Sequence, residues 1–303
     1  MPELPEVQAH AERLTSDFGG EVLNGFRVLS FSALKTVEPS PDQAVGLSLL
    51  KFGRRGKLLL AYFGDPAGDG PAEVEASVDA VPGKSAGGEP NELADDAALS
   101  LGNSAVPPDG VHLTFVIHLM QAGRLVPDDK QSPRPRNGLA RWSFESGRAL
   151  LLTEAGKEHK AGIWVTTGDP LTEPPLLGLG IDAGSMTLAE LRSALVERNQ
   201  RLHGFLRDQK GIAGIGRMLA NEVCHRAKLS PFQMTRKLTD DDCLRLYDAI
   251  RECIADALRN ERSLPTMSKS ADRPASVHHR KGQPCPVCGD TVRAVEYNAY
   301  EVD

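Results

Sequence analysis

The sequence predicts an α+β protein in which a strand-rich half precedes a helical half. Apolar residues alternate along much of the first half, as they do along strands that bury one face. From about Met186 they recur every three or four residues, as they do along one face of a helix. The 303 residues and 40% hydrophobic content are enough for two domains with their own cores. We expect these domains at residues 1–170 and 176–270, with an appendage at 271–303.

A helix should precede the strands. Residues 5–18 have apolar positions spaced four, three and four apart, which form one helical face that Gly19-Gly20 would end. The face consists of Val7, Ala11, Leu14 and Phe18. Alternation then predicts strand structure at Val22, Phe26, Val28 and Phe31, before an apolar run from Leu58 to Phe63. Later strands are expected at 112–118, 141–144, 149–152 and 162–165.

The second half carries three helix signals. One helical face is formed by Leu188, Leu191 and Leu195. A glycine-rich turn at 211–216 precedes a helix that should run through Arg226. Thr239 and Asp242 have the spacing of a capping box, which predicts the start of a long helix ending near Asn260.

The segment 65–110 differs from the rest of the chain in composition. It holds ten acidic residues and a single base, Lys84, and it is rich in Gly, Ala, Pro and Ser. Such a segment cannot bury enough apolar surface to offset its chain entropy, so we expect a disordered insertion. The net charge of −6 argues against nucleic-acid binding, but the insertion contributes −9 and leaves +3 for the remainder.

The remaining composition bounds the compartment. Five cysteines are an odd number and do not suggest a disulfide scaffold, and Cys224, Cys243 and Cys253 are expected to be buried thiols in helices. The chain has no run of about 18 apolar residues and no signal-peptide pattern. We therefore expect a cytoplasmic protein that has no membrane partner and is a monomer.

The first seven residues, Met-Pro-Glu-Leu-Pro-Glu-Val, allow two interpretations. Removal of Met1 would expose the secondary amine of Pro2 beside the carboxylates of Glu3 and Glu6. An α-amino group has a pKa of about 7.7–8.0, so part of it is unprotonated at neutral pH. A secondary amine that attacks a sugar aldehyde carbon gives an iminium that keeps its positive charge and withdraws electrons. Alternatively, Pro2 and Pro5 only start a helix, whose positive end suits both glutamates.

Two turns have the composition of phosphate contacts. The stretch Phe52-Gly-Arg-Arg-Gly-Lys57 holds three cations, which suit either a phosphate track or a solvated turn. These cations are Arg54, Arg55 and Lys57. The glycines of Asp208-Gln-Lys-Gly-Ile-Ala-Gly-Ile-Gly216 would let backbone amides approach phosphate at a helix N-terminus, although a plain turn has the same pattern. The candidates in this second turn are Lys210, Gly214, Gly216 and Arg217.

A possible metal site lies near the C-terminus. Cys285-Pro-Val-Cys288-Gly289 has the spacing of a zinc-knuckle turn. Structural Zn²⁺ takes four ligands, so Cys285 and Cys288 make up half a site. His278 and His279 precede them and are alternative ligands for the other half. We expect weak occupancy by Zn²⁺ in a half site.

These motifs, in this order, resemble the formamidopyrimidine-DNA glycosylase / endonuclease VIII family of base-excision repair enzymes. The resemblance covers nearly the whole chain apart from the acidic insertion. It is strongest at residues 2–7, 52–58, 111–125, 207–232 and 278–293. It implies an N-terminal β-sandwich carrying the Pro2 helix, a helix–two-turns–helix domain and a partial zinc-finger hairpin. It also implies damaged double-stranded DNA as the partner and a zinc finger of four cysteines, whose second pair would follow Tyr300.

The resemblance assigns roles to single residues. Pro2 would attack C1′ of the damaged nucleotide, Glu3 would act as acid and base on the sugar, and Glu6 would hold the structure of the site. Lys57 would contact a phosphate near the abasic site. Loss of the base would be followed by elimination of the 3′ and then the 5′ phosphate. Further DNA contacts would come from Arg54, Arg55, Gln121, Lys210, Gly214, Gly216, Arg217 and Arg280.

Three stretches depart from the family pattern. His118-Leu-Met-Gln-Ala-Gly-Arg124 resembles the family's His-Leu-Gly-Met-Ser-Gly-Arg loop, whose methionine fills the gap left by the flipped base. Gln121 takes that place here, and Met120 lies one residue earlier. Residues 153–161 lack the Pro-Arg-Arg-Phe loop of the branch that cuts oxidised purines, so the damaged base stays open. Arg217 stands where family members commonly have asparagine.

Three functions remain open at this point. The first is a bifunctional glycosylase and AP lyase. The second is a catalytically weak or inactive DNA-binding relative, which Arg217 and the half zinc site suggest. The third is an N-terminal-proline tautomerase, but that class uses small subunits and needs no DNA module. The joint presence of Pro2, Glu3, Glu6 and Lys57 favours the first.

Overall fold

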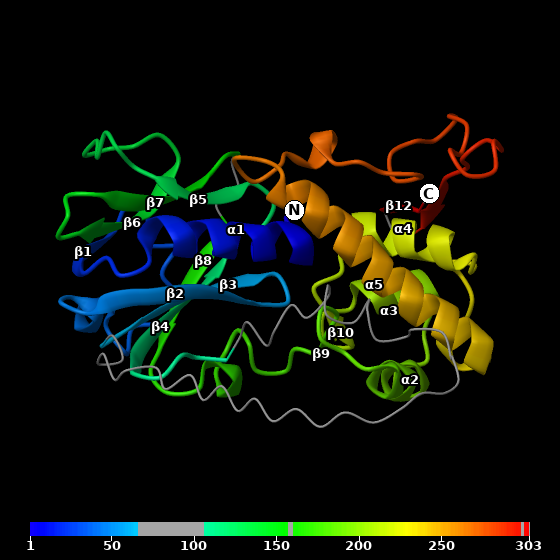
Figure 1. The fold of residues 1–303 in the computed structure, drawn as a ribbon, viewed down its shortest axis with the longest axis horizontal. Helices are drawn as coiled ribbons and strands as arrows, with labels where there is room; N and C mark the ends of the chain where they lie inside the picture. The colour runs from blue at the N-terminus through cyan, green and yellow to red at the C-terminus, as the bar shows by residue number, and fades with distance from the viewer. Residues whose placement is uncertain (66–105, 157–159, 298–299, 303) are drawn as a thin grey trace, which may run out of the picture.

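The computed structural model describes residues 1–65, 106–156, 160–297 and 300–302. Most of the insertion expected at 65–110 therefore lies outside the described residues. Strands fill one half of the molecule and helices the other, so the predicted α+β class is confirmed (Figure 1).

The N-terminal half is a sandwich of two four-stranded antiparallel sheets. The strand orders are β2-β3-β4-β8 and β1-β6-β7-β5. The first sheet consists of β2 (Ser48–Arg55), β3 (Leu58–Gly64), β4 (Val111–His118) and β8 (Gly162–Thr166). The second consists of β1 (Leu23–Val28), β6 (Gly138–Phe144), β7 (Ala149–Glu154) and β5 (Gly123–Pro127). All of the later strands predicted from alternation are present.

Aromatic side chains fill the space between the two sheets. Trp142 is 2% exposed and packs edge-on against Phe26 and Phe115, with ring centroids 4.9 and 5.6 Å apart. Such contacts add to the free energy gained from apolar burial. Phe31 does not join this core, although its spacing predicted that it would. Strand β1 ends at Val28, and Phe31 lies in the following turn with 95% of its surface exposed.

The second half is mainly helical. Its helices are α2 (Leu188–Glu197), α3 (Leu202–Arg207), α4 (Arg217–Ala227) and α5 (Asp240–Arg262). Two short parallel strands, β9 (Ile181–Asp182) and β10 (Ile212–Ala213), lie before α2 and before α4. The predicted capping box of Thr239 and Asp242 does begin α5. A last hairpin is formed by β11 (Val295–Tyr297) and β12 (Tyr300–Val302).

Helix α1 (Leu4–Phe18) belongs to both halves. Val7 and Leu14 lie in the core of the sandwich, whereas Leu4 and Ala9 lie in the core of the helical half. In Figure 1 the helix runs alongside the two sheets and its N-terminal end reaches α5. The amphipathic pattern predicted the contacts of α1 with the core of the sandwich. Its contacts with the core of the helical half mean that the first turn of the helix is held between the two halves.

The ends of the insertion lie side by side. The N–H of Asp65 donates to the carbonyl oxygen of Gly110 at 3.1 Å, next to the antiparallel pairing of β3 with β4. The insertion therefore occupies the turn of a hairpin. Among the described residues, no helix is both long and apolar enough to cross a membrane.

Candidate active site

The N-terminus lies where the sheets and the helices meet (Figure 1). Pro2 is buried, whereas Met1 is 41% exposed. The N–H of Leu4 donates to the carbonyl oxygen of Gly214 at 3.0 Å, and the N–H of Glu3 donates to Glu6 Oε2 at 2.6 Å. The first turn of α1 is thus fixed both by its own cap and by the helical half.

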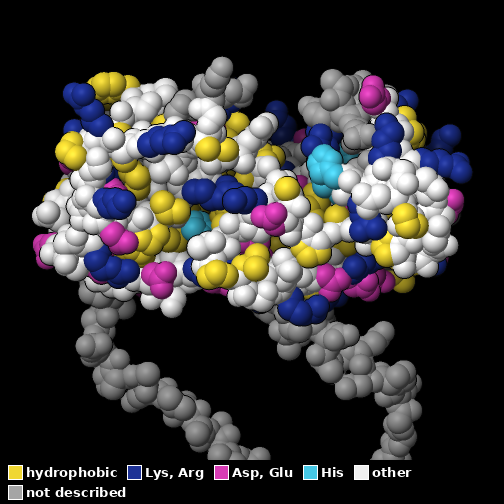
Figure 2. Space-filling model, turned by 90° about the horizontal axis from the view of Figure 1, so that it is seen from above, with side chains coloured by type: hydrophobic (Ala, Val, Ile, Leu, Met, Phe, Trp, Pro, Cys, Tyr) yellow, Lys and Arg dark blue, Asp and Glu magenta, His cyan; other side chains and the backbone are white. Residues whose placement is uncertain are grey.

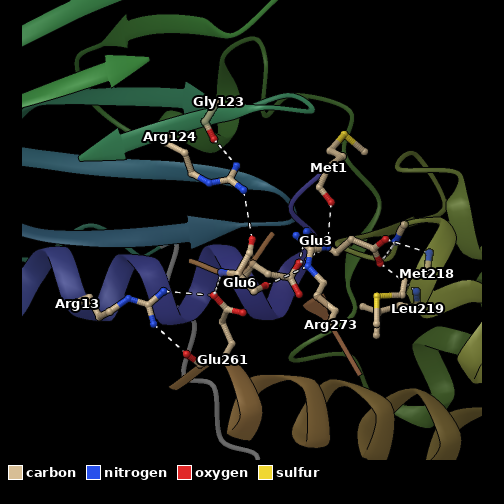
Figure 3. A network of polar contacts seen from close by, with 12 residues as sticks. Met1, Glu3, Glu6, Arg13, Gly123, Arg124, Met218, Leu219, Glu261 and Arg273 are labelled. Carbon is tan, nitrogen blue, oxygen red and sulfur yellow. Dashed lines mark hydrogen bonds and ion pairs between the residues drawn. The ribbon is translucent and has the colours of Figure 1, made fainter. Parts of the chain in front are cut away.

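Glu3 reaches across to the N-terminus of α4. Its carboxylate accepts hydrogen bonds from the N–H groups of Gly216, Met218 and Leu219 at 2.8, 3.1 and 3.1 Å. The side chain is buried, and it lies at the positive end of the helix, where a negative charge is stabilised. Figure 3 shows it pointing toward Met218 and Leu219. The backbone of one domain therefore fixes the carboxylate that the other domain presents beside Pro2.

Glu6 belongs to a buried network of charges. Its Oε2 lies 3.2 Å from Nη1 of Arg273, and both side chains are nearly inaccessible to solvent. Burial raises the pKa of Glu6 to about 7, although the charge of Arg273 lowers it. In Figure 3, Arg273 lies between Glu6 and Met1. At neutral pH the carboxyl group of Glu6, which lies next to the chain's N-terminus, is therefore only partly ionised.

Lys57 lies in the hairpin turn between β2 and β3 and is buried. Burial lowers the pKa of its ammonium group, while the charges of Glu3 and Glu6 raise it. Lys57 in turn contributes to lowering the pKa of His118, which burial reduces to about 4. Lys57 therefore lies close enough to Glu3 and Glu6 for their charges to act on it, so three of the residues proposed as catalytic are near one another.

Arg54 and Arg55, of the predicted phosphate track, have partners within the protein. Arg54 donates from Nη1 and Nη2 to both oxygens of Asp182, at 2.8 and 3.0 Å, and its side chain is 2% exposed. Arg55 also donates to Asp182, at 3.1 Å, and to the carbonyl oxygen of Gly180. Both guanidinium groups therefore bind the helical half. Asp182 thus forms an interdomain ion pair with both arginines, and their assignment as phosphate contacts stays a prediction.

The glycine-rich turn also has partners within the protein. The N–H of Gly214 donates to Gln209 Oε1 at 3.0 Å, and the N–H of Gly216 donates to Glu3. A Cβ at Gly214 would press on Leu4, and one at Gly216 would overlap the Glu3 carboxylate. These glycines let the N-terminal segment approach, and their assignment as phosphate-binding amides stays a prediction.

Two basic residues at this turn differ in exposure. Lys210 is exposed and precedes the glycines. Arg217 is half-buried as the first residue of α4. Both remain predicted DNA contacts.

The loop between β4 and β5 separates the two candidate wedge residues. Met120 has φ of 52° and packs partly against the core of the sandwich. Gln121 is exposed at the tip of the loop. Gln121 therefore stays the predicted residue for the gap left by a flipped base.

Comparison with known proteins gives two family matches. A family model of the formamidopyrimidine-DNA glycosylase N-terminal domain matches residues 1–157. A second, of the formamidopyrimidine-DNA glycosylase H2TH domain, matches residues 177–268. The chain belongs to the formamidopyrimidine-DNA glycosylase family.

Individual relatives agree with this membership. A formamidopyrimidine-DNA glycosylase of Pelotomaculum thermopropionicum is 27% identical over 96% of this chain and 93% of that one. A formamidopyrimidine-DNA glycosylase-like protein of Mycobacterium tuberculosis is 36% identical over 41% of this chain and 80% of that one.

Solved structures share the fold. MutM (Fpg) of Thermus thermophilus has a TM-score of 0.71 at 23% identity, covering 99% of this chain and 96% of that one. Lactococcus lactis Fpg, in a complex with N7-benzyl-Fapy-dG DNA, has a TM-score of 0.74 at 17% identity, covering 99% and 97%.

The part of the chain that the structure describes holds no full set of ligands for the zinc ion that the family resemblance implies. No group of three or more His, Cys, Asp or Glu side chains there is arranged to hold a metal ion. Sγ of Cys285 instead lies 3.2 Å from Nε2 of His225 on α4, and Cys288 is exposed. Arg280, the predicted DNA contact of this segment, donates to the carbonyl oxygen of Pro284.

A cavity of about 280 Å³ adjoins the charged network of this glycosylase-family protein. It lies between α4, α5 and the segment 273–276, and Glu6 and Arg273 both line it. Figure 2 views the molecule from above relative to Figure 1, and it shows Lys and Arg side chains spread over both halves of that face.

Sequence analysis missed two residues that hold the site together. Asp182 occupies the two-residue strand β9, which no periodicity marks, and Arg273 lies in an irregular segment after α5. Each is a single charge whose partner is more than a hundred residues away in sequence. No local pattern marks either residue.

Proposed function

We propose that this protein is a DNA glycosylase of base-excision repair with an associated AP lyase activity, and that Pro2 is its nucleophile. The observation that carries the proposal is the position of Pro2, buried at the junction of the two halves beside Glu3, Glu6 and Lys57. An N-terminal amine, a fixed carboxylate and a buried cation in one place suit attack on a sugar carbon that bears a leaving group. Family membership supports DNA as the partner.

The proposed reaction begins at C1′ of the damaged nucleotide. The Pro2 nitrogen bonds to C1′ while the C1′–base bond breaks, and the base leaves with the electron pair. Glu3 takes the proton of the attacking amine and returns it to O4′ when the C1′–O4′ bond breaks, which leaves the iminium. The iminium then acidifies C2′. Water takes the C2′ proton while the C3′–O bond breaks and the 3′ phosphate leaves with the electron pair; loss of the C4′ proton to water then expels the 5′ phosphate in the same way. Lys57 would stabilise phosphate charge near the sugar.

The substrate must leave the duplex for this chemistry, because C1′ and the base are enclosed in it. Gln121 is the side chain proposed to fill the gap left by the flipped nucleotide. The cavity beside Glu6 and Arg273 is proposed as the space for the flipped base. A panel of duplexes, each carrying a different oxidised base, would identify which lesion is cut fastest.

Borohydride trapping on duplex DNA with an abasic site tests the proposal. Protein lacking Met1 should form a stable covalent adduct with this DNA. Pro2→Gly and a form that retains Met1 should lose most of it, while both still bind DNA. Equal trapping by the form that retains Met1 would refute Pro2 as the nucleophile. DNA binding without any trapping would instead support an inactive DNA-binding relative.

A further inference from the structure

Arg273 contacts the peptide bond between Met1 and Pro2, which must be cleaved to give the Pro2 amine that the proposed reaction uses. Its Nη1 donates to the carbonyl oxygen of Met1 at 3.2 Å, and the same nitrogen lies 3.2 Å from Glu6 Oε2. Its Nε donates to Ser268 Oγ at 3.1 Å, so the guanidinium is held from a second side. The side chain is 4% exposed (Figure 3).

The carbonyl of Met1 stands in for part of the substrate. Its carbon is bonded to the Pro2 nitrogen, and in the covalent adduct C1′ is bonded to that same nitrogen. The carbonyl oxygen therefore marks a position for an oxygen that C1′ carries. In a nucleotide that oxygen is O4′, and in the open form of an abasic site it is the aldehyde oxygen.

Bond lengths limit how far Arg273 can be from the amine. The carbonyl oxygen of Met1 is two bonds from the Pro2 nitrogen, which places Nη1 of Arg273 within about 6 Å of it. A positive charge at this range disfavours protonation of an amine. The pKa of the Met1 amino group is already lowered, first by burial and then by Arg273. Pro2 lies deeper than Met1, so the same influences act on it.

Resting on the proposed function, we propose that Arg273 is a further residue of the reaction centre, which donates a hydrogen bond to the oxygen on C1′ and keeps the Pro2 amine unprotonated. Arginine keeps its proton, so it transfers none; it stabilises negative charge on that oxygen as its bond to C1′ breaks or as the aldehyde is attacked. The proton for the oxygen still comes from Glu3.

Other charges also face this amine and set its titration. Those that lie around the first turn of α1 are Glu3, Glu6, Lys57, Arg124 and Glu261. The glutamates raise the pKa of the amino terminus and the arginines lower it. A purely structural role for Arg273, as the counter-ion of Glu6, is the competing explanation.

The test measures the rate of borohydride trapping on abasic-site duplex between pH 5.5 and 9, using protein lacking Met1. Arg273→Gln should move the acidic limb of the rate upward by about one pH unit, which lowers trapping about tenfold on that limb. Arg273→Lys keeps the charge and a donor, so it should recover most of the rate. Arg262→Gln is the matched control, because it removes an arginine from a surface pair with Glu12. Its profile should match wild type.

A double variant separates the two explanations. Glu6→Gln/Arg273→Gln removes both charges of the buried pair and leaves no unpaired ion. The double variant is compared with Glu6→Gln alone, in which the opposing charge of Glu6 is already absent. If Arg273 acts on Pro2, the acidic limb of the double variant lies at higher pH than that of Glu6→Gln; two profiles that coincide would mean that Arg273 only neutralises Glu6. An Arg273→Gln profile that superimposes on the control would overturn the inference while the proposed function stands. Failure of the wild type to trap at any pH would overturn both.

Discussion

Asp182 joins the two halves through hydrogen bonds from three residues of the sandwich, so its replacement by asparagine should destabilise the protein. Its carboxylate accepts from Arg54, Arg55 and the N–H of Gly56, the last at 2.8 Å. Burial would raise its pKa, but the charge and hydrogen bonds of Arg54 outweigh it and hold the pKa at about 2. The site thus favours the ionised carboxylate, and asparagine supplies no charge to replace it.

The magnitude follows from the pKa and from the burial of the partner. A pKa of about 2, against about 3.9 in an unfolded chain, corresponds to about 2.5 kcal/mol of stability. Asp182→Asn also leaves the guanidinium of Arg54 buried without its counter-ion, and breaking a buried pair in this way costs about 3–5 kcal/mol. We expect a loss of about 3 kcal/mol at pH 7. The folded-state pKa lies below the unfolded one, so this stability is complete above about pH 4 and is lost as the pH falls toward 2.

Urea unfolding at pH 7, 5 and 3 measures the effect. Both tryptophans, Trp142 and Trp164, lie in strands of the sandwich, so their fluorescence reports that half, while far-UV circular dichroism reports the helices as well. In Asp182→Asn the two signals should separate, because the ion pairs of Asp182 with Arg54 and Arg55 are lost. These ion pairs, the Asp182 clamp, couple the two halves. The difference from wild type should shrink between pH 5 and pH 3.

The matched control is Asp256→Asn, which breaks an ion pair with Arg226 whose side chains are 49% and 37% exposed. Such a surface pair is worth less than about 1 kcal/mol. If Asp182→Asn destabilises the protein no more than this control does, the clamp does not hold the halves together. A loss that stays constant between pH 5 and pH 3 would show that the charge of Asp182 is not responsible.

Two further changes test the site and the insertion. Gly216→Ala should reduce borohydride trapping at least tenfold in protein that still folds, because a Cβ there displaces the Glu3 carboxylate. Overpacking of this kind costs about 1–3 kcal/mol of stability, which urea unfolding measures. Unchanged trapping would show that Glu3 tolerates the shift. Deleting 66–105 should leave the melting temperature almost unchanged, because Asp65 and Gly110 already pair at the base of the hairpin; loss of soluble protein would contradict this.

Regular elements were predictable because their signals are local. The capping box at Thr239 fixes the start of α5 with residues three positions apart, and alternation marks each later strand of the sandwich. Phe31 shows the limit of that reasoning. A period of two or three residues does not say where a strand ends, and β1 ends three residues before it.

The candidate site was predictable only in part, and for a different reason. Pro2, Glu3, Glu6 and Lys57 were found through residue types and the resemblance to a family. The partners of Arg54 were not, because a basic turn looks the same whether its cations face solvent or a buried carboxylate. Asp182 lies 128 residues from Arg54, and nothing in the local sequence of either residue identifies the other.

The contacts that fix the site show why neither half would form it alone. The first turn of α1 belongs to the sandwich by sequence, yet its orientation depends on Gly214, Gly216 and Arg273 from the helical half. The carboxylate of Glu3 meets three N–H groups only after α4 has formed, since those groups are the unpaired donors of a helix N-terminus. Docking of the two halves is therefore the step that places the Pro2 amine beside its charged neighbours. Weakening the Asp182 clamp should then reduce reactivity at Pro2 as well as stability, although the hydrogen-bond partners of the Asp182 carboxylate are Arg54, Arg55, Gly56 and Gly184.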